Sequence, residues 1–190
     1  FRVNYRSIGH EPWMVRLLAK DPNVWNMAEQ MLGKGSLQEP DRIRGIYCTL
    51  PFGSHPKPSL TCHVDGHPFH LGVVGYIDDV APMGGSFTVW PGSHKHFYYA
   101  FNSQYEHDRN EEYPRICEYY NGHQPVDCFG EAGDIVFWHH RLAHMASPNS
   151  TCNVRQAVLY DFKKTDINQT QFGPPLDNMW EDWSAEFHSN

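Results

Sequence analysis

The stretch that decides the fold is Cys62-His63-Val64-Asp65-Gly66-His67-Pro68-Phe69-His70. Successive side chains of an extended strand alternate between its two faces, so His63 and Asp65 point the same way. An imidazole and a carboxylate on one face supply two of the three protein ligands of a facial metal site, and a histidine from a distant strand would complete it. The chain has thirteen histidines, so a chance pair on a polar strand end is the simpler interpretation of this stretch alone.

Length and charge restrict the class of protein. The 190 residues are enough for one domain with a buried core. The formal charge of −7, without any cluster of Lys and Arg, argues against a nucleic-acid partner. No apolar run approaches the length of a membrane span, and no signal peptide is visible, so no membrane partner is expected. The chain begins at Phe1 rather than Met, so we expect a trimmed N-terminus.

The five cysteines form no CxxC pair and no zinc spacing. An odd, sparse set is typical of a reducing compartment, which favours the cytoplasm while leaving the location open. If the protein is secreted, Cys117 and Cys128 are the pair that could form a disulfide. Glycosylation sequons begin at Asn149 and Asn168, but such triplets are common by chance.

The N-terminal part predicts two helices. Residues 10–20 have a proline in the first predicted turn and Trp13, Leu17 and Leu18 at helical spacing. Asp21-Pro22 is typical of a second helix start, with an apolar face that ends at Gly33. We expect both helices to buttress a sheet.

From residue 42 the pattern alternates and predicts strands. They cover residues 43–50, 71–80, 86–90, 135–145 and 154–162. We divide the single domain into N-terminal helices over 1–40, a jelly-roll core over 41–165 and a tail with a short helix over 166–190. In that tail Trp180, Trp183 and Phe187 recur at helical spacing. The expected fold is therefore mainly β with flanking helices, a sandwich or barrel of the jelly-roll type.

Residues 94–129 form a long, tyrosine-rich segment without clear periodicity. Loops of this length inside a compact domain are usually functional or disordered, and the tyrosines argue against disorder. Two interpretations stay open: a lid over a pocket, which we favour, and a packed surface insertion.

Four pieces in order make the sequence resemble the phytanoyl-CoA dioxygenase family of Fe(II)/2-oxoglutarate oxygenases. They are His63-Val64-Asp65; residues 85–94, which read GSFTVWPGSH; Gly133-Asp134 leading to His139 and His144; and Asn149 followed by Arg155. The resemblance implies a double-stranded β-helix, the cupin-like jelly roll. It also implies Fe(II) held by His63, Asp65 and His144, with 2-oxoglutarate and O2 as co-substrates.

The resemblance assigns further residues. Arg155 matches the arginine that binds the distal carboxylate of 2-oxoglutarate, for which a planar guanidinium fork is suited. Tyr76 falls near a family position that lines the co-substrate pocket, with a small shift in spacing. A small hydroxyl residue is usual two positions after the third ligand, but Ala146 stands there, so Ser147 is the candidate for that contact. We expect His67 and His70 at the mouth of the pocket, in reach of substrate.

The third metal ligand has competitors. In a regular strand His140 shares the face of His144, whereas the family pattern places a non-ligand histidine where His139 stands. The family pattern favours His144. A cupin-like set of His63, Asp65 and His67 is also conceivable, but Gly66 and Pro68 should bend the chain there.

We therefore predict a dioxygenase that hydroxylates or otherwise oxidises a small organic substrate and releases succinate and CO2. The alternative is a non-catalytic jelly roll that binds metal or 2-oxoglutarate as a sensor or degenerate relative. A non-catalytic relative should have lost a metal ligand or the arginine. This sequence retains all four residues, His63, Asp65, His144 and Arg155.

Overall fold

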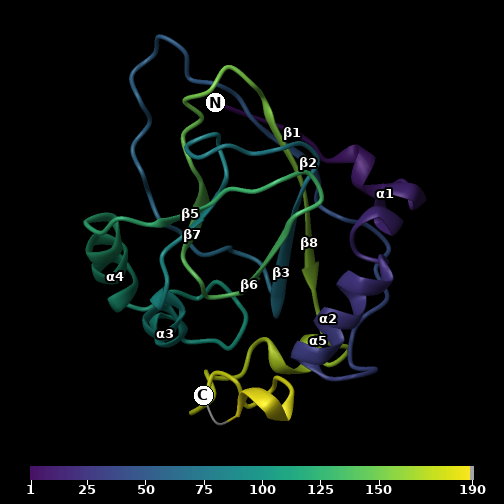
Figure 1. The fold of residues 1–190 in the computed structure, drawn as a ribbon. Coiled ribbons are helices and arrows are strands. Elements are labelled where there is room, and N and C mark those ends of the chain that lie inside the picture. The colour runs from purple at the N-terminus through teal and green to yellow at the C-terminus, as the bar shows by residue number, and fades with distance from the viewer. Residues whose placement is uncertain (189–190) are drawn as a thin grey trace.

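Two antiparallel sheets form the body of the protein, shown in Figure 1 as a computed structural model that describes residues 1–188. The first sheet has the order β1-β2-β8-β3-β6 and the second the order β5-β4-β7. The strands of the first are β1 (Arg2–Tyr5), β2 (Gly45–Thr49), β8 (Arg155–Phe162), β3 (Leu71–Tyr76) and β6 (Ile135–His139). Those of the second are β5 (Val126–Cys128), β4 (Phe87–Val89) and β7 (His144–Ala146). The predicted fold class, mainly β with helices in a double-stranded β-helix, is confirmed.

The space between the sheets is filled from β8 and its neighbours. Ala157 and Leu159 of β8 are buried together with Val74 and Tyr76 of β3 in one apolar cluster. Opposite β3, Trp138 of β6 belongs to the same cluster, and a Cβ atom on its partner Gly72 would overlap the indole ring. A glycine is therefore required there to seat the tryptophan.

Helices cover the outer face of the five-stranded sheet. They are η1 (Ser7–His10), α1 (Pro12–Leu17) and α2 (Pro22–Leu32), and they lie together on one side of the strands in Figure 1. The predicted start of α2 is confirmed, because the Asp21 carboxylate accepts hydrogen bonds from the backbone N–H groups of Asn23 and Val24.

The first predicted helix was wrong in length and in its buried face at Trp13 and Leu17, whereas the predicted Leu18 is buried. Instead of one helix over 10–20, the chain forms η1, a break and the six residues of α1. Trp13 and Leu17 are exposed, and the buried side is made by Met14, Val15 and Leu18. The sheet buries Met14 and Val15, the positions between those that we selected.

Residues 94–129 are folded rather than irregular. They contain α3 (Ser93–Phe97, which begins one residue earlier), η2 (Tyr98–Ala100), α4 (Glu112–Asn121) and β5. Tyr98, Tyr105, Tyr113 and Tyr120 are buried. Tyr113 and Tyr120 pack in a second apolar cluster with Phe97, so these two tyrosines support the packed-insertion interpretation over the lid.

The prediction of one strand over 135–145 was also wrong. β6 ends at His139 and β7 begins at His144, and the two strands belong to different sheets. The turn between them separates the histidines that a single strand would have aligned, so His140 and His144 do not share a strand face.

The tail differs from the predicted single helix. It contains α5 (Ile167–Thr170) and the 3₁₀ helix η3 (Ala185–Phe187), with turns between them. Trp183 is nevertheless buried, and Trp180 and Phe187 pack against the same cluster, so these aromatic residues do cover the core. Residues 189–190 of the predicted tail lie outside the described residues. All five cysteines are free thiols, and no helix in the described chain is long and apolar enough to cross a bilayer.

Candidate metal centre

An isolated antiparallel bridge brings the two key histidines together. The N–H of His63 donates to the carbonyl of His144 at 3.3 Å, and the N–H of His144 donates back at 2.9 Å. Directly opposed residues in an antiparallel pair have side chains on one face. Their ring centroids are accordingly 4.7 Å apart, although the histidines come from distant parts of the chain.

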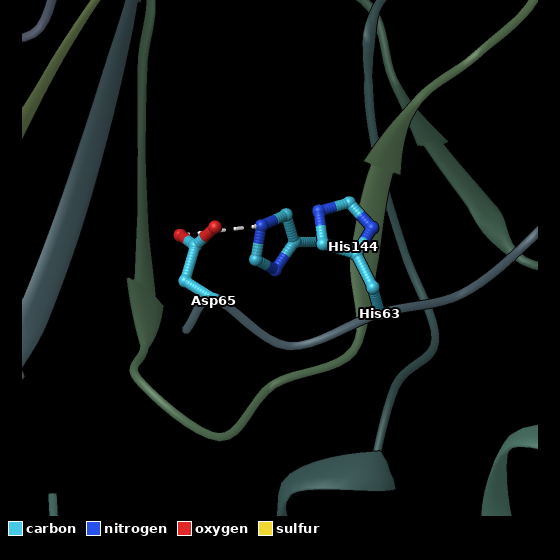
Figure 2. A group of neighbouring side chains, drawn as sticks. All are labelled: His63, Asp65 and His144. Atoms are coloured by element: carbon cyan, nitrogen blue, oxygen red, sulfur yellow. Dashed lines mark ion pairs between the residues drawn. The ribbon is translucent and has the colours of Figure 1, made fainter. Parts of the chain in front are cut away.

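Asp65 completes the group. Its Oδ2 lies 3.6 Å from Nε2 of His144, and one potential ligand atom from each of the three residues falls within 4.8 Å of the others. Figure 2 shows the carboxylate pointing toward the imidazole rings of both histidines. Among residues 1–188, this is the one such group of three or more His, Cys, Asp or Glu side chains.

The hydrogen bond of His144 favours Nε2, the ring nitrogen that faces Asp65, as its metal-binding atom. Its Nδ1 lies 2.9 Å from the carbonyl oxygen of Leu142, which can only accept, so Nδ1 carries the proton. In the neutral imidazole, Nε2 on the side of Asp65 is then the nitrogen with the free electron pair. Metal-binding histidines in proteins are oriented by this kind of bond to the second ring nitrogen.

The electrostatics favour the ionisation states that a metal requires. Burial, and then the nearby His144, lower the pKa of His63 to about 4, so its imidazole is neutral near pH 7. Burial opposes the charge of Asp65, but the adjacent His144 and the Arg44 guanidinium outweigh it and hold the pKa of that carboxyl well below its usual range. A neutral imidazole and an ionised carboxylate bind a divalent ion without first losing protons.

Arg44 is a residue of the centre that the sequence did not reveal. Its Nη2 donates to Asp65 Oδ2 at 2.7 Å, while Nε and Nη2 grip both carboxylate oxygens of Asp161 at 2.6 and 2.5 Å. Burial would lower the pKa of Arg44, but Asp161 and Asp65 outweigh it and raise that pKa. The sequence held one signal for this network: the alternation of residues 154–162 places Asp161, the partner of Arg44, on the same face as Arg155 and Ala157.

The competing histidines lie elsewhere. Nε2 of His140 lies 3.3 Å from the carbonyl oxygen of Gln104, and its ring contacts Tyr105. His67 is more exposed, and its Nε2 lies 2.8 Å from Asp161 Oδ2 rather than beside His63. Neither belongs to the group of three.

His70 was predicted at the mouth of the pocket, and that prediction was wrong. Its side chain is buried against Tyr105, its Nδ1 accepts from the backbone N–H of Lys164, and its Nε2 lies 3.7 Å from Asp182. Phe69 and His70 are both buried, so the alternation expected from the sequence does not continue past Pro68.

Arg155 is a buried cation without a carboxylate partner among the described residues. Its Nε donates to the Gly85 carbonyl at 2.7 Å and its Nη1 to the Tyr47 carbonyl at 3.3 Å. Burial lowers its pKa to about 10. Neutral carbonyl groups do not compensate a buried positive charge as an anion would, so the guanidinium is suited to receive one.

The two other residues predicted near the co-substrate have partners already. The Tyr76 hydroxyl accepts from the N–H of Phe87 at 2.8 Å and donates to the Cys128 carbonyl, while its ring lies 5.8 Å from the Arg155 guanidinium carbon. Ser147 is buried, with its Oγ 3.4 Å from that of Ser86. Tyr76 thus offers its ring rather than its hydroxyl.

Comparisons with known proteins agree with the fold. The phytanoyl-CoA dioxygenase (PhyH) family profile matches residues 18–157. EctD from S. alaskensis, solved with 2-oxoglutarate and 5-hydroxyectoine, is 19% identical with a TM-score of 0.58, over 88% of this chain and 57% of its own. The epimerase SnoN, in complex with Fe3+, alpha ketoglutarate and nogalamycin RO, is 22% identical with a TM-score of 0.57, over 96% and 76%.

EvdMO1 is 18% identical with a TM-score of 0.58, and the match covers 87% of this chain. The matches cover only part of these relatives: this chain spans 36% of the length of EvdMO1 and 57% of that of EctD. No curated protein matches the sequence.

Proposed function

The chain belongs to the phytanoyl-CoA dioxygenase family, and on that premise we propose that it is an Fe(II)/2-oxoglutarate-dependent oxygenase of a small organic substrate. The observation that carries the proposal is the meeting of His63, Asp65 and His144, whose potential ligand atoms lie within 4.8 Å of one another. Two imidazoles and one carboxylate are the protein ligands of non-haem Fe(II) oxygenases.

The residues fit this metal on their own chemistry. The proton on His144 Nδ1 leaves Nε2 free, His63 is neutral, and Asp65 is ionised. Bound Fe(II) would supply the activation of O2, with 2-oxoglutarate oxidised to succinate and CO2. The protein's part is to hold the ligands on one side, so that the other side stays open to the co-substrate.

Arg155 is proposed to bind the distal carboxylate of 2-oxoglutarate. Its Nη2 has no hydrogen-bond partner within the described chain, and its charge is buried among neutral groups. The ring of Tyr76 would line the site beside the guanidinium, and Ser147 is proposed as a second polar contact. A bidentate guanidinium–carboxylate pair would fix the orientation of the co-substrate.

An anaerobic titration tests the proposal. Fe(II) added to the protein, followed by 2-oxoglutarate, should produce the weak visible charge-transfer band that forms when the keto acid chelates iron. Air should then convert 2-oxoglutarate to succinate. Formation of the band without any succinate, across a broad metabolite panel, would instead favour a non-catalytic binder. If the charge-transfer band does not form, the proposed function is contradicted.

A further inference from the structure

A cavity of about 670 Å³ opens beside the metal centre, a volume typical of small-molecule sites. Asp65 and His67 reach it from the metal-binding stretch, and Arg44 and Asp161 line it next to them. Of the three proposed metal ligands, Asp65 lines the cavity, and this contact with the metal site makes the cavity the candidate substrate site.

The lining is unsuited to an acyl chain. Within the described chain, Ile43, Tyr47 and Tyr160 are the lining members with an apolar chain or a phenol ring, and every other lining side chain is charged or is able to form hydrogen bonds. Burying an acyl chain is favourable because apolar surfaces leave water together. Here such a chain would instead strip water from charged groups, which is unfavourable.

The lining holds four Lys or Arg side chains and four carboxylates, but these charges are not all paired with one another. Arg44 is already held by Asp65 and Asp161, and Glu39 is paired with Lys20, which lies outside the lining. The remaining cations are the exposed Arg6 and Arg42 and the half-buried Lys163, none of which pairs with a carboxylate in the described structure. Asp41 is the one remaining carboxylate of the lining. Unpaired cations inside a concave site attract anionic ligands.

We infer that the substrate is a small hydrophilic molecule that carries an anionic group, either a carboxylate or a phosphate. The inference rests on the proposed function, which makes the cavity a substrate site. Arg6, Arg42 and Lys163 bind the anionic group, and the polar lining receives hydroxyl or amide groups of the same molecule. This substrate class excludes long acyl chains.

Inorganic phosphate and acetate serve as minimal probes of the cation cluster. Protein loaded with Zn(II) and 2-oxoglutarate is titrated with each anion at constant ionic strength, set with chloride, and the arginine Nε–Hε resonances are followed by NMR. The Arg6 and Arg42 resonances should shift with saturation, while that of the distant, exposed Arg115 stays in place. Which anion saturates at the lower concentration distinguishes phosphate from carboxylate recognition.

Charge reversal provides the variants. Arg42→Glu combined with Lys163→Glu should raise the half-saturating anion concentration at least tenfold, while Arg42→Lys keeps binding. Lys34→Glu is the matched control, because Lys34 is exposed and outside the cavity lining. Resonances that do not move, or an equal loss in Lys34→Glu, would overturn the inference.

Turnover gives the second arm. Oxygen-dependent consumption of 2-oxoglutarate is measured with glucose 6-phosphate and gluconate, with glucose, and with octanoate, as polar anions, a polar neutral compound and an apolar anion. Stimulation by a polar anion supports the inference, and stimulation confined to glucose or octanoate overturns it. If none stimulates, the anion titration decides. Absence of the iron–2-oxoglutarate band would be a failure of the proposed function instead, because that band requires no substrate.

Discussion

Arg44 holds Asp65 at 2.7 Å and, through the same guanidinium, grips Asp161 at 2.6 and 2.5 Å. The carboxylate of the proposed metal site is thus tied to β8 of the five-stranded sheet, while His144 sits on β7 of the other sheet. The orientation of Asp65 is therefore fixed by partners outside its own segment, through a partly buried ion-pair network.

Arg44→Lys should weaken metal binding by about 10- to 100-fold, the usual effect of losing a group that orients a ligand. Lysine keeps the charge but cannot bridge two carboxylates with a planar fork. Co(II) affinity, measured against a competing chelator, gives the readout, with Lys34→Arg as the control. Tighter metal binding in Arg44→Lys would mean that repulsion between the guanidinium and the ion outweighs its positioning.

His144→Ala and His63→Ala should each nearly abolish Fe(II) binding, since each removes one of the three proposed protein ligands. His140→Ala is the matched control: His140 is buried, as His144 is, but lies outside the group of three. Anaerobic iron analysis of the purified variants gives the stoichiometry. Loss of iron from His140→Ala with retention in His144→Ala would reassign the third ligand.

Arg155→Ala should weaken 2-oxoglutarate by about 100-fold or more. The loss of one partner of a buried charged pair costs about 3 to 5 kcal/mol, and each factor of ten in affinity corresponds to about 1.4 kcal/mol. Iron should still bind, and Arg155→Lys should be intermediate. The midpoint of the charge-transfer titration checks this, and an unchanged midpoint would contradict the co-substrate role.

Acid should destabilise the fold through His70. Burial, and then Lys164 and Lys163, lower its pKa from 6.5 to about 3, so the unfolded chain binds more protons between those values. Stability therefore falls as the pH drops below about 6.5, by about 2 kcal/mol between pH 7 and pH 5 from this residue. Denaturant unfolding at both pH values should show a smaller loss in His70→Asn. Equal losses in the two proteins would show that His70 does not carry the effect.

Tyr113→Ala should lower stability by about 3 to 5 kcal/mol, as for other large buried aromatic residues. Its ring packs against Phe97 and Phe101 and receives the Arg109 guanidinium at 4.1 Å. Tyr119→Ala, on the exposed side of the same helix, should change the melting temperature little. If Tyr113→Ala kept its stability but altered the dependence on substrate, the lid interpretation would return.

The sequence correctly predicted the features that depend on a few neighbouring residues. The Asp21 cap and the shared face of His63 and Asp65 each depend on a few neighbouring residues, and both appear in the structure. The choice of His144 over His140 came instead from the family resemblance, because alternation over a supposed single strand favoured both equally. The chain turns between the two histidines, and nothing in the local pattern announced that β6 and β7 would join different sheets.

Long-range pairing explains what was missed. Arg44 meets Asp161 across 117 residues, and that contact arises only when β2 pairs with β8. His70 is buried because of Tyr105 and the tail, which no pattern around residue 70 could indicate. Such contacts can be predicted only when the strand pairing is known, and strand pairing depends on how distant segments pack into the same core.

The tie between Arg44 and Asp161 also sets an order of events during synthesis. Chains emerge from the ribosome N-terminus first. The segment with His63 and Asp65 is therefore exposed long before β7 delivers His144, and longer still before β8 delivers Asp161. A nascent chain halted before β8 has neither the strand that pairs with β2 nor the anchor for Arg44. The proposed metal site and the ion pairs that hold Asp65 are therefore complete only after β8 has been synthesised and has paired with β2.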